Sequence, residues 1–135
     1  MREKIENTVY FGVHDFVCDI KIIADILQID RYNGWSKGEP IPHRKNVVSE
    51  VGVWEIQSPL PKSNSLEKHI NCLLKLLLPR VDNLNLLYDR YQATSEFSVE
   101  ICTYDVANFG FHLNSQLVDK INKLGASLDV DIYNL

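Results

Sequence analysis

A chain of 135 residues is long enough to fold as one domain around its own hydrophobic core, so its stability requires neither a metal ion nor a disulfide framework. The formal net charge of −4 argues against nucleic acid as a partner, since phosphate binding requires a basic surface, and it is compatible with a basic protein partner. Cys18, Cys72 and Cys102 are too widely spaced for a zinc motif, and the longest apolar run, residues 73–78, is too short to cross a bilayer. We therefore expect one cytoplasmic domain over residues 1–135, with reduced thiols, no cofactor and no membrane contact.

A strand, a helix and a long loop are predicted at the start of the chain. Residues 8–14 alternate between apolar and other side chains, as expected of a strand with one buried face. Asp19 stands where a helix N-cap is needed, and an apolar stripe with helical spacing follows over residues 20–27. Residues 30–46 are rich in glycine, proline and basic side chains, which predicts a loop that is either functional or mobile. A second strand is predicted over residues 47–56.

Gly52 lies within the predicted second strand and indicates a bulge or the close approach of another backbone. After this strand, the sequence predicts two consecutive helices. Ser65 is placed to cap a helix whose apolar stripe runs over residues 66–77. Pro79 cannot continue a helix without loss of a hydrogen bond, but it can begin a new one. The helical period resumes over residues 81–91, so we expect a break at the proline.

The last third predicts two paired strands, a helix and a final strand. Residues 96–104 alternate, and residues 108–113 are expected to pair with them as a fourth strand. Asn114 or Ser115 caps the last helix, and Gly125 supplies its left-handed C-terminal residue. The final strand is expected to place Leu128, Val130 and Ile132 inside and Asp129, Asp131 and Tyr133 outside.

These elements give the order β-α-β-α-α-β-β-α-β. Strands that alternate cleanly belong to a sheet with one covered face, so the helices are expected to pack on that face. The predicted fold class is α+β, with a mostly antiparallel sheet of about five strands. A strand–helix–strand unit at each end suggests a ferredoxin-like plan.

Several segments in order resemble the bacterial domain-of-unknown-function family 4279. They are residues 35–39, 51–54, 65–70, 73–74 and 111–133, and together they extend the resemblance from about Val9 to Tyr133. The resemblance implies a small, stand-alone bacterial cytosolic protein, and some members are similar to immunity proteins of toxin systems. It implies no activity and no catalytic residues.

One face of the predicted sheet carries aromatic and acidic side chains. If the strands are adjacent, the helix-free side presents Tyr10, His14, Glu100, Cys102, Tyr104, Asp129, Asp131 and Tyr133. Tyrosine provides contact area at a low entropic cost, and carboxylates attract a basic partner, so this surface is a candidate protein-binding face. The alternatives are an ordinary solvated face or a face covered by self-association.

The two tryptophans form a second candidate site. Trp35 lies in the basic loop and is a candidate contact for a ligand or partner, because exposed tryptophan is frequent in binding hot spots. The structural alternative, which the large burial energy of an indole ring favours, is that Trp35 packs the loop against Trp54.

Catalytic and metal-binding patterns are weak throughout. Asp129 and Asp131 share a strand face, but no nucleophile is placed beside them, so a solvated pair is favoured over acid–base catalysis. Cys102 has acidic rather than basic neighbours, which disfavours a reactive thiolate. The spacing of the histidines and cysteines does not support a metal site, and the glycines form no phosphate-binding motif.

Three functional hypotheses remain. The first is a non-enzymatic binding protein, such as an immunity protein that neutralises a basic toxin domain. The second is a small-ligand or hydrolytic site between loop 30–46 and the sheet, lined by Trp35, His43, Arg44 and Trp54. The third is a structural homodimer formed through the open sheet face.

Overall fold

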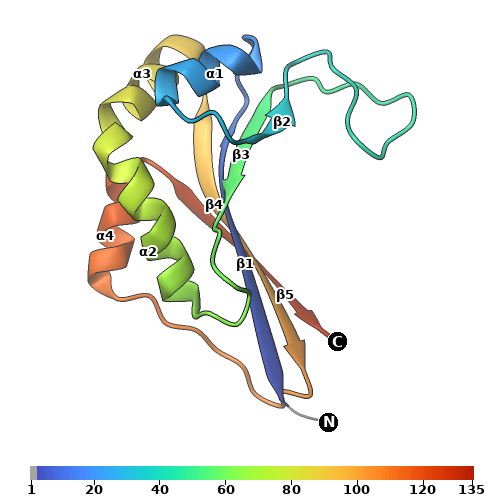
Figure 1. Ribbon diagram of the computed structural model, residues 1–135, viewed down its shortest axis with the longest axis vertical. Helices are drawn as coiled ribbons and strands as arrows, with labels where there is room; N and C mark the ends of the chain where they lie inside the picture. Colours follow the sequence, from blue (N-terminus) through green and yellow to red (C-terminus); the bar gives the residue numbers. More distant parts are fainter. Residues whose placement is uncertain (1–2) are drawn as a thin grey trace.

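The fold is α+β, with helices packed on one face of an open, five-stranded mixed sheet (Figure 1). The structure is a computed structural model and describes residues 3–135. The strand order is β2-β3-β1-β4-β5, and every pair is antiparallel except β4 with β5. The elements are β1 (Lys4–His14), α1 (Ile20–Leu27), β2 (Asn33–Trp35), β3 (Val53–Gln57), α2 (Leu66–Leu77), the short 3₁₀ helix η1 (Leu78–Arg80), α3 (Val81–Tyr91), β4 (Thr94–Tyr104), α4 (Ser115–Lys123) and β5 (Ser127–Asn134).

The core lies between the helices and the covered face of the sheet, as the alternation predicts. β1 contributes Val9, Phe11 and Val13, all fully buried, and β4 contributes residues of the same alternating pattern. The rings of Phe11 and Phe97 pack edge to face, with their centroids 5.1 Å apart. Each α-helix directs its apolar stripe to this layer, including Ile23 of α1. The opposite face of the sheet carries no helix in residues 3–135 (Figure 1).

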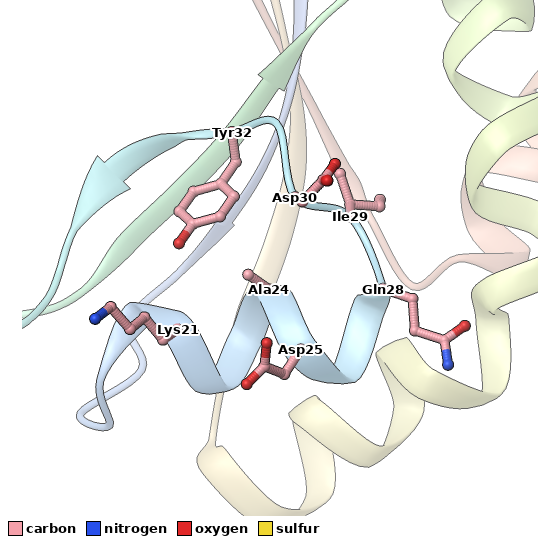
Figure 2. A pocket seen from close by; sticks show the side chains of 7 residues that line it. All are labelled: Lys21, Ala24, Asp25, Gln28, Ile29, Asp30 and Tyr32. Carbon is pink, nitrogen blue, oxygen red and sulfur yellow. The ribbon is translucent and has the colours of Figure 1, made fainter.

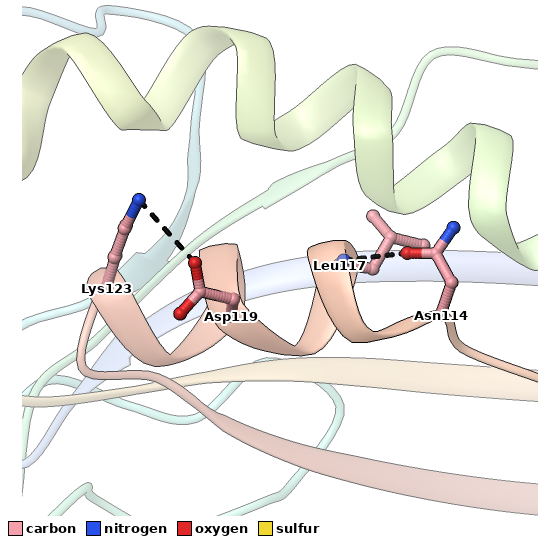
Figure 3. Close-up of polar contacts among 4 residues, drawn as sticks. All are labelled: Asn114, Leu117, Asp119 and Lys123. Carbon is pink, nitrogen blue, oxygen red and sulfur yellow. Dashed lines mark hydrogen bonds and ion pairs between the residues drawn. The ribbon is translucent and has the colours of Figure 1, made fainter.

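The predicted helix caps are confirmed. The carboxylate of Asp19 accepts a hydrogen bond from the backbone N–H of Lys21 at 2.8 Å, and the Ser65 hydroxyl accepts one from Lys68. Figure 3 shows the same arrangement in α4, where Asn114 accepts from Leu117 at 2.9 Å. An exposed ion pair between Lys123 and Asp119 lies one turn further along this helix. Each cap satisfies an N–H group that has no partner within its helix.

The break at Pro79 is also confirmed. The proline lies in η1, which connects α2 directly to α3, so its missing N–H falls in the first turn of a new segment. Arg80 binds this corner to α1, because its Nε donates to the carbonyl of Leu27 at 2.8 Å. The side-chain amide of Asn83 donates to the carbonyl of Ile26 in the same region.

Gly125 ends α4 in the left-handed conformation predicted for it, with φ of 70°. The ring of Tyr88 packs closely over this glycine, and its hydroxyl donates to the carbonyl of Leu124 at 2.6 Å. The same hydroxyl shares a hydrogen bond with Ser95 of β4. One tyrosine therefore joins α3, β4 and the end of α4.

Three strand predictions are corrected. The first strand begins at Lys4 rather than residue 8, and the second covers Val53–Gln57 rather than residues 47–56. Residues 108–113 form no strand, because the position beside β4 is taken by β5 in parallel pairing. The short β2 replaces the lost strand, so the observed order is β-α-β-β-α-α-β-α-β.

Residues 36–52 form an arm that projects away from the sheet (Figure 1). Backbone hydrogen bonds join the two halves of the arm. Gly38 N donates to Ser49 O at 2.8 Å, and Ile41 N donates to Val47 O at 3.0 Å. Its start is fixed to α1 by the Ser36 hydroxyl, which accepts from the backbone N–H of Ile20 at 2.8 Å. Loop 30–46 is thus partly ordered, as a hairpin-like arm that extends to residue 52.

The base of the arm is fixed by Gly52. Its N–H donates to the carbonyl of Phe16 at 2.8 Å, and its own carbonyl accepts from Asp15. A Cβ atom at this position would overlap the ring of Phe16, which is fully buried. The close approach predicted for Gly52 is confirmed, although the residue lies just before β3 rather than inside a strand.

β5 lies at the edge of the sheet and is more exposed than predicted. Leu128, Val130 and Ile132 lie on the helix-covered side, since they pair with Phe97, Val99 and Ile101 of β4. The exposed fractions of Leu128 and Ile132 are nevertheless 38% and 46%. The expected direction of these side chains is right and their expected burial is wrong, because an edge strand has a neighbour on one side only.

Candidate functional site: the open face of the sheet

The strand register brings the predicted binding residues onto one surface, which we call the open face. Tyr10 pairs with Ser98, and Thr8 pairs with Glu100, so β1 and β4 present these side chains on the same side. β5 continues the surface, because Asp131 pairs with Glu100. The open face consists of Lys4, Glu6, Thr8, Tyr10, Gly12 and His14 of β1, Val53, Glu55 and Gln57 of β3, Glu96, Ser98, Glu100, Cys102 and Tyr104 of β4, and Asp129, Asp131 and Tyr133 of β5.

The open face is strongly acidic. It carries six carboxylates, and Lys4 at one end is its only lysine or arginine among the described residues. Because the whole chain has a formal charge of −4, the negative charge is concentrated on this surface. The six acidic residues are Glu6, Glu55, Glu96, Glu100, Asp129 and Asp131.

Three of these carboxylates were not predicted. Glu6 lies before the expected start of the first strand, and Glu55 belongs to β3, whose place beside β1 was not known. Glu96 shares the alternation of Glu100 and was overlooked as the first residue of its predicted strand. Extending the period-two pattern to the ends of the strands would have identified Glu6 and Glu96.

The centre of the open face holds Tyr10 between two acidic residues. Partial burial raises the pKa of the Tyr10 hydroxyl, and the nearby carboxylates of Glu100 and Glu55 raise it further. Tyr10 therefore remains protonated at neutral pH and offers an O–H donor at the middle of an acidic surface. A basic group of a partner would meet an aromatic ring and two carboxylates at this point.

Glu55 has an unusual environment beside Gly12. Burial raises the pKa of the Glu55 carboxyl, the charge of His14 lowers it, and the charge of Glu100 raises it again. The His14 ring lies over Gly12, at a position that a Cβ atom would occupy. A glycine opposite Glu55 thus gives the histidine room to lie near the carboxylate.

The other end of the face contains Lys4, Glu6 and Tyr104. The ammonium group of Lys4 lies 3.4 Å from the Glu6 carboxylate and 5.1 Å from the centroid of the Tyr104 ring. A hydrogen bond with Tyr104 lowers the pKa of the Glu6 carboxyl, and the same interaction raises the pKa of the tyrosine hydroxyl. The Lys4 side chain is exposed and Glu6 is only partly buried, so this ion pair contributes little to stability.

The two tryptophans do not pack against each other. Trp35 pairs with Val53, so it lies on the side of the open face, whereas Trp54 is fully buried on the helix side. Trp54 contacts the ring of Tyr32, a loop residue just before β2, and the two ring centroids are 6.0 Å apart. Val53 and Trp54 are adjacent in β3 and point to opposite faces of the sheet, and Trp35 shares the face of Val53. The predicted packing of Trp35 on Trp54 is therefore wrong.

The predicted lining of a pocket between loop 30–46 and the sheet is wrong: a cavity of about 320 Å³ there lies between residues 30–33 and residues 55–57 of β3, and it contains none of the four predicted side chains. His43 and Arg44 are exposed residues of the projecting arm, while Trp54 is enclosed in the core, so these side chains do not line one cavity. A second shallow cavity, of about 360 Å³, lies along α1 between Lys21, Asp25 and Tyr32 (Figure 2). Figure 2 shows that its polar groups are spread along the cavity rather than directed to one point.

A buried Ser–His pair was not predicted. The hydroxyl of Ser58, just after β3, lies 2.7 Å from Nδ1 of His69 in α2, and both side chains are almost fully buried. Eleven residues and a change of element separate them, so no local pattern signals the pair. Neither residue lines the cavity along α1, and the pair connects the end of β3 to α2 as a structural contact.

The Ser–His pair makes stability sensitive to pH. Burial lowers the pKa of His69, and its contact with the backbone of Pro61 opposes this only in part. The unfolded chain therefore takes up the proton first, and the free energy of unfolding is expected to fall as the pH decreases below about 6.5. Urea unfolding at several pH values between about 5 and 8 measures this slope.

The variant His69→Gln isolates the histidine, since it keeps a side chain that can bond Ser58 but removes the titration. Its slope in this range is expected to be smaller than that of the wild type. Glu55 acts in the opposite direction, because its raised pKa adds stability on acidification, and it is unchanged in both proteins. Equal slopes would show that His69 is not the group responsible.

Residues 3–135 contain neither a metal-binding cluster nor a membrane-spanning helix. No group of three or more histidine, cysteine, aspartate or glutamate side chains is arranged to hold a metal ion. No helix in the same part of the chain has the length and apolar character needed to span a bilayer. Cys18, Cys72 and Cys102 are unpaired.

The fold and the open face together define an α+β protein with a one-sided helical layer and an acidic sheet surface. The chain belongs to the DUF4279 family, described as a domain of unknown function, whose model matches residues 3–135. Searches of curated proteins and of solved structures give no significant match.

Proposed function

We propose that the protein is a non-enzymatic binding module whose open face receives a basic surface of a partner protein. The observation that supports this most directly is the concentration of six carboxylates on one helix-free sheet face. Tyr10, Tyr104 and Tyr133 add aromatic contact area among these charges. Such a surface accelerates association with a basic partner and repels acidic ones.

The finer form of this proposal is an immunity protein in the cytoplasm that neutralises a basic toxin domain. An acidic face can cover a cationic toxin surface directly, without any chemical step by the bound protein. The three unpaired cysteines suit a reducing compartment. Under this proposal the product of the adjacent gene is the first partner to test.

Charge reversal tests the open face. The double variant Glu100→Lys/Asp131→Lys is expected to weaken binding of the adjacent gene's purified product by at least tenfold, which corresponds to about 1.4 kcal/mol. Most of the loss is expected in the association rate, since these side chains are exposed. Surface plasmon resonance at low and high salt measures both the affinity and its ionic-strength dependence.

The matched control is Asp25→Lys/Asp89→Lys, which changes the net charge equally but lies on exposed positions of α1 and α3. It is expected to retain most of the affinity. If both double variants weaken binding to the same extent, long-range charge rather than the open face is responsible. If the adjacent product does not bind the wild-type protein, the immunity role is excluded for that partner.

A further inference from the structure

We infer that the free edge of β5 binds an extended segment of a partner protein in which lysine or arginine residues alternate with aliphatic residues. This site shares Asp129 and Asp131 with the open face but differs from the proposed open-face contact, because it uses the backbone of β5 and the side chains on both sides of the strand. It requires only that the partner segment can adopt a β-strand beside residues 127–134.

The backbone groups on the outer edge of β5 are available for pairing. Leu135 N donates to the carbonyl of Thr103 at 2.8 Å, so its N–H points toward β4. N–H and C=O groups alternate in direction along a strand, and Asp131 and Asp129 therefore point toward β4 as well. The residues between them, Val130 and Ile132, direct their backbone groups outward.

This edge lacks most of the features that prevent strand addition, and its only charged residues are Asp129 and Asp131. β5 is eight residues long, is paired without interruption over its length with β4, and contains neither proline nor lysine. All of its residues except Val130 are exposed. An edge of this kind is a template for another strand unless its side chains exclude one.

The two sides of β5 specify what kind of strand fits. On the open-face side, Asp129 and Asp131 favour a basic residue directly across from each. On the helix side, Leu128 and Ile132 are partly exposed and continue the apolar layer. Beside them a groove of about 230 Å³ is lined largely by apolar side chains, including Val118 and Ile121 of α4. A strand with alternating cationic and aliphatic side chains satisfies both sides.

A second copy of this chain fits the edge poorly. In an antiparallel β5–β5 pair that keeps the apolar side facing the helices, Asp129 and Asp131 of each copy lie across from or diagonal to the same residues of the other. Like charges in these positions are destabilising. The charge pattern thus disfavours self-association at the edge and favours a partner of opposite charge.

The proposal is tested with a fluorescein-labelled peptide of sequence Lys-Val-Lys-Ile-Lys-Val-Lys and a control peptide with the same composition in a non-alternating order. Fluorescence anisotropy is expected to show at least tenfold tighter binding of the alternating peptide. Equal binding of the two peptides would overturn the proposal, because attraction by net charge alone does not depend on residue order.

The edge itself is tested with two substitutions at one position. Ile132→Pro removes an outward N–H without removing a hydrogen bond to β4, and it is expected to weaken peptide binding at least tenfold. Ile132→Thr also removes the isoleucine side chain but keeps the N–H, so it is expected to bind more tightly than the proline variant. Equal affinities of Ile132→Pro and Ile132→Thr would overturn strand pairing.

A measurement on the wild-type protein covers the case in which the proline variant does not fold. Two versions of the alternating peptide are prepared. Each is N-methylated at the residues whose N–H groups lie along one of the two edges of the peptide strand, a different edge in each version. One of these peptides is expected to bind and the other not, because only one edge faces β5. Equal binding of both would overturn the proposal, and so would a dimer in analytical ultracentrifugation that Ile132→Pro converts to a monomer.

Discussion

Replacement of Trp54 by alanine is expected to lower the free energy of unfolding by about 3–5 kcal/mol, the range for truncating a buried tryptophan. Trp54 is fully buried in the core, between the sheet and α1, and contacts Tyr32. Its removal leaves a cavity where the arm, β2 and β3 join the core. Since domains of this size have a total stability of about 5–15 kcal/mol, urea unfolding of the variant should occur at a much lower midpoint.

Two other variants define the cause of this effect. Trp54→Phe retains much of the ring volume and buries no indole N–H, so it is expected to be clearly less destabilising than Trp54→Ala. Trp35→Ala removes the same side chain from a half-buried position on the other face, and it should cost less than Trp54→Ala. If Trp35→Ala is the more destabilising of the two alanine variants, the assignment of the rings to opposite faces is wrong.

Gly52→Ala is expected to destabilise the protein by about 1–3 kcal/mol, the range for inserting a carbon into a packed core. The added Cβ would overlap the buried ring of Phe16, and the Gly52 backbone cannot withdraw without loss of its hydrogen bonds to Phe16 and Asp15. Thermal unfolding monitored by circular dichroism measures the change. A reduction of the melting temperature by several degrees is expected.

Gly110→Ala is the matched control, since no atom lies near the Cβ position there and its backbone is not in the left-handed region. It is expected to leave the melting temperature within about a degree, as for a surface substitution. The double variant Gly52→Ala/Phe16→Leu should lose less stability than the two single changes predict together, because the smaller side chain relieves the overlap. Strict additivity would show that the glycine is required for another reason.

The sequence was sufficient for the elements whose signals are local. The side chains of Asp19, Ser65 and Asn114 each accept a hydrogen bond from a backbone N–H two or three residues ahead, so these caps depend on neighbouring residues only. Pro79 interrupts a helix because of its own ring. The one-sided architecture followed from the alternation along β1 and β4, which depends only on the direction of successive side chains.

The incorrect strands were those whose outcome depends on distant contacts. Val47 and Val48 have high β-propensity, but they lie in the exposed arm because Gly52 is held against Phe16 before β3 can begin. Phe109 packs partly against the core from an irregular segment, since β5 occupies the strand position beside β4. Neither Gly52's partner nor the parallel pairing can be read from the segments themselves.

The candidate site was predicted in composition more than in extent. Tyr10, Glu100 and Asp131 were placed on one face from alternation alone, and the register confirms that their strands are neighbours. Glu55 was not included, because its position beside Gly12 depends on the order of the strands. Whether the face binds a protein stays a prediction until the charge-reversal variants are measured.

The position of β1 at the middle of the sheet has a consequence for biosynthesis. β1 leaves the ribosome before the other strands, but its partners β3 and β4 begin only at Val53 and Thr94. A nascent chain shorter than about four-fifths of the described length thus exposes an apolar strand with no complete neighbour on one side, a state prone to aggregation. Completion of the fold must wait for contacts between residues about 90 positions apart, so this strand order is expected to make folding slower than in a chain whose strands pair locally.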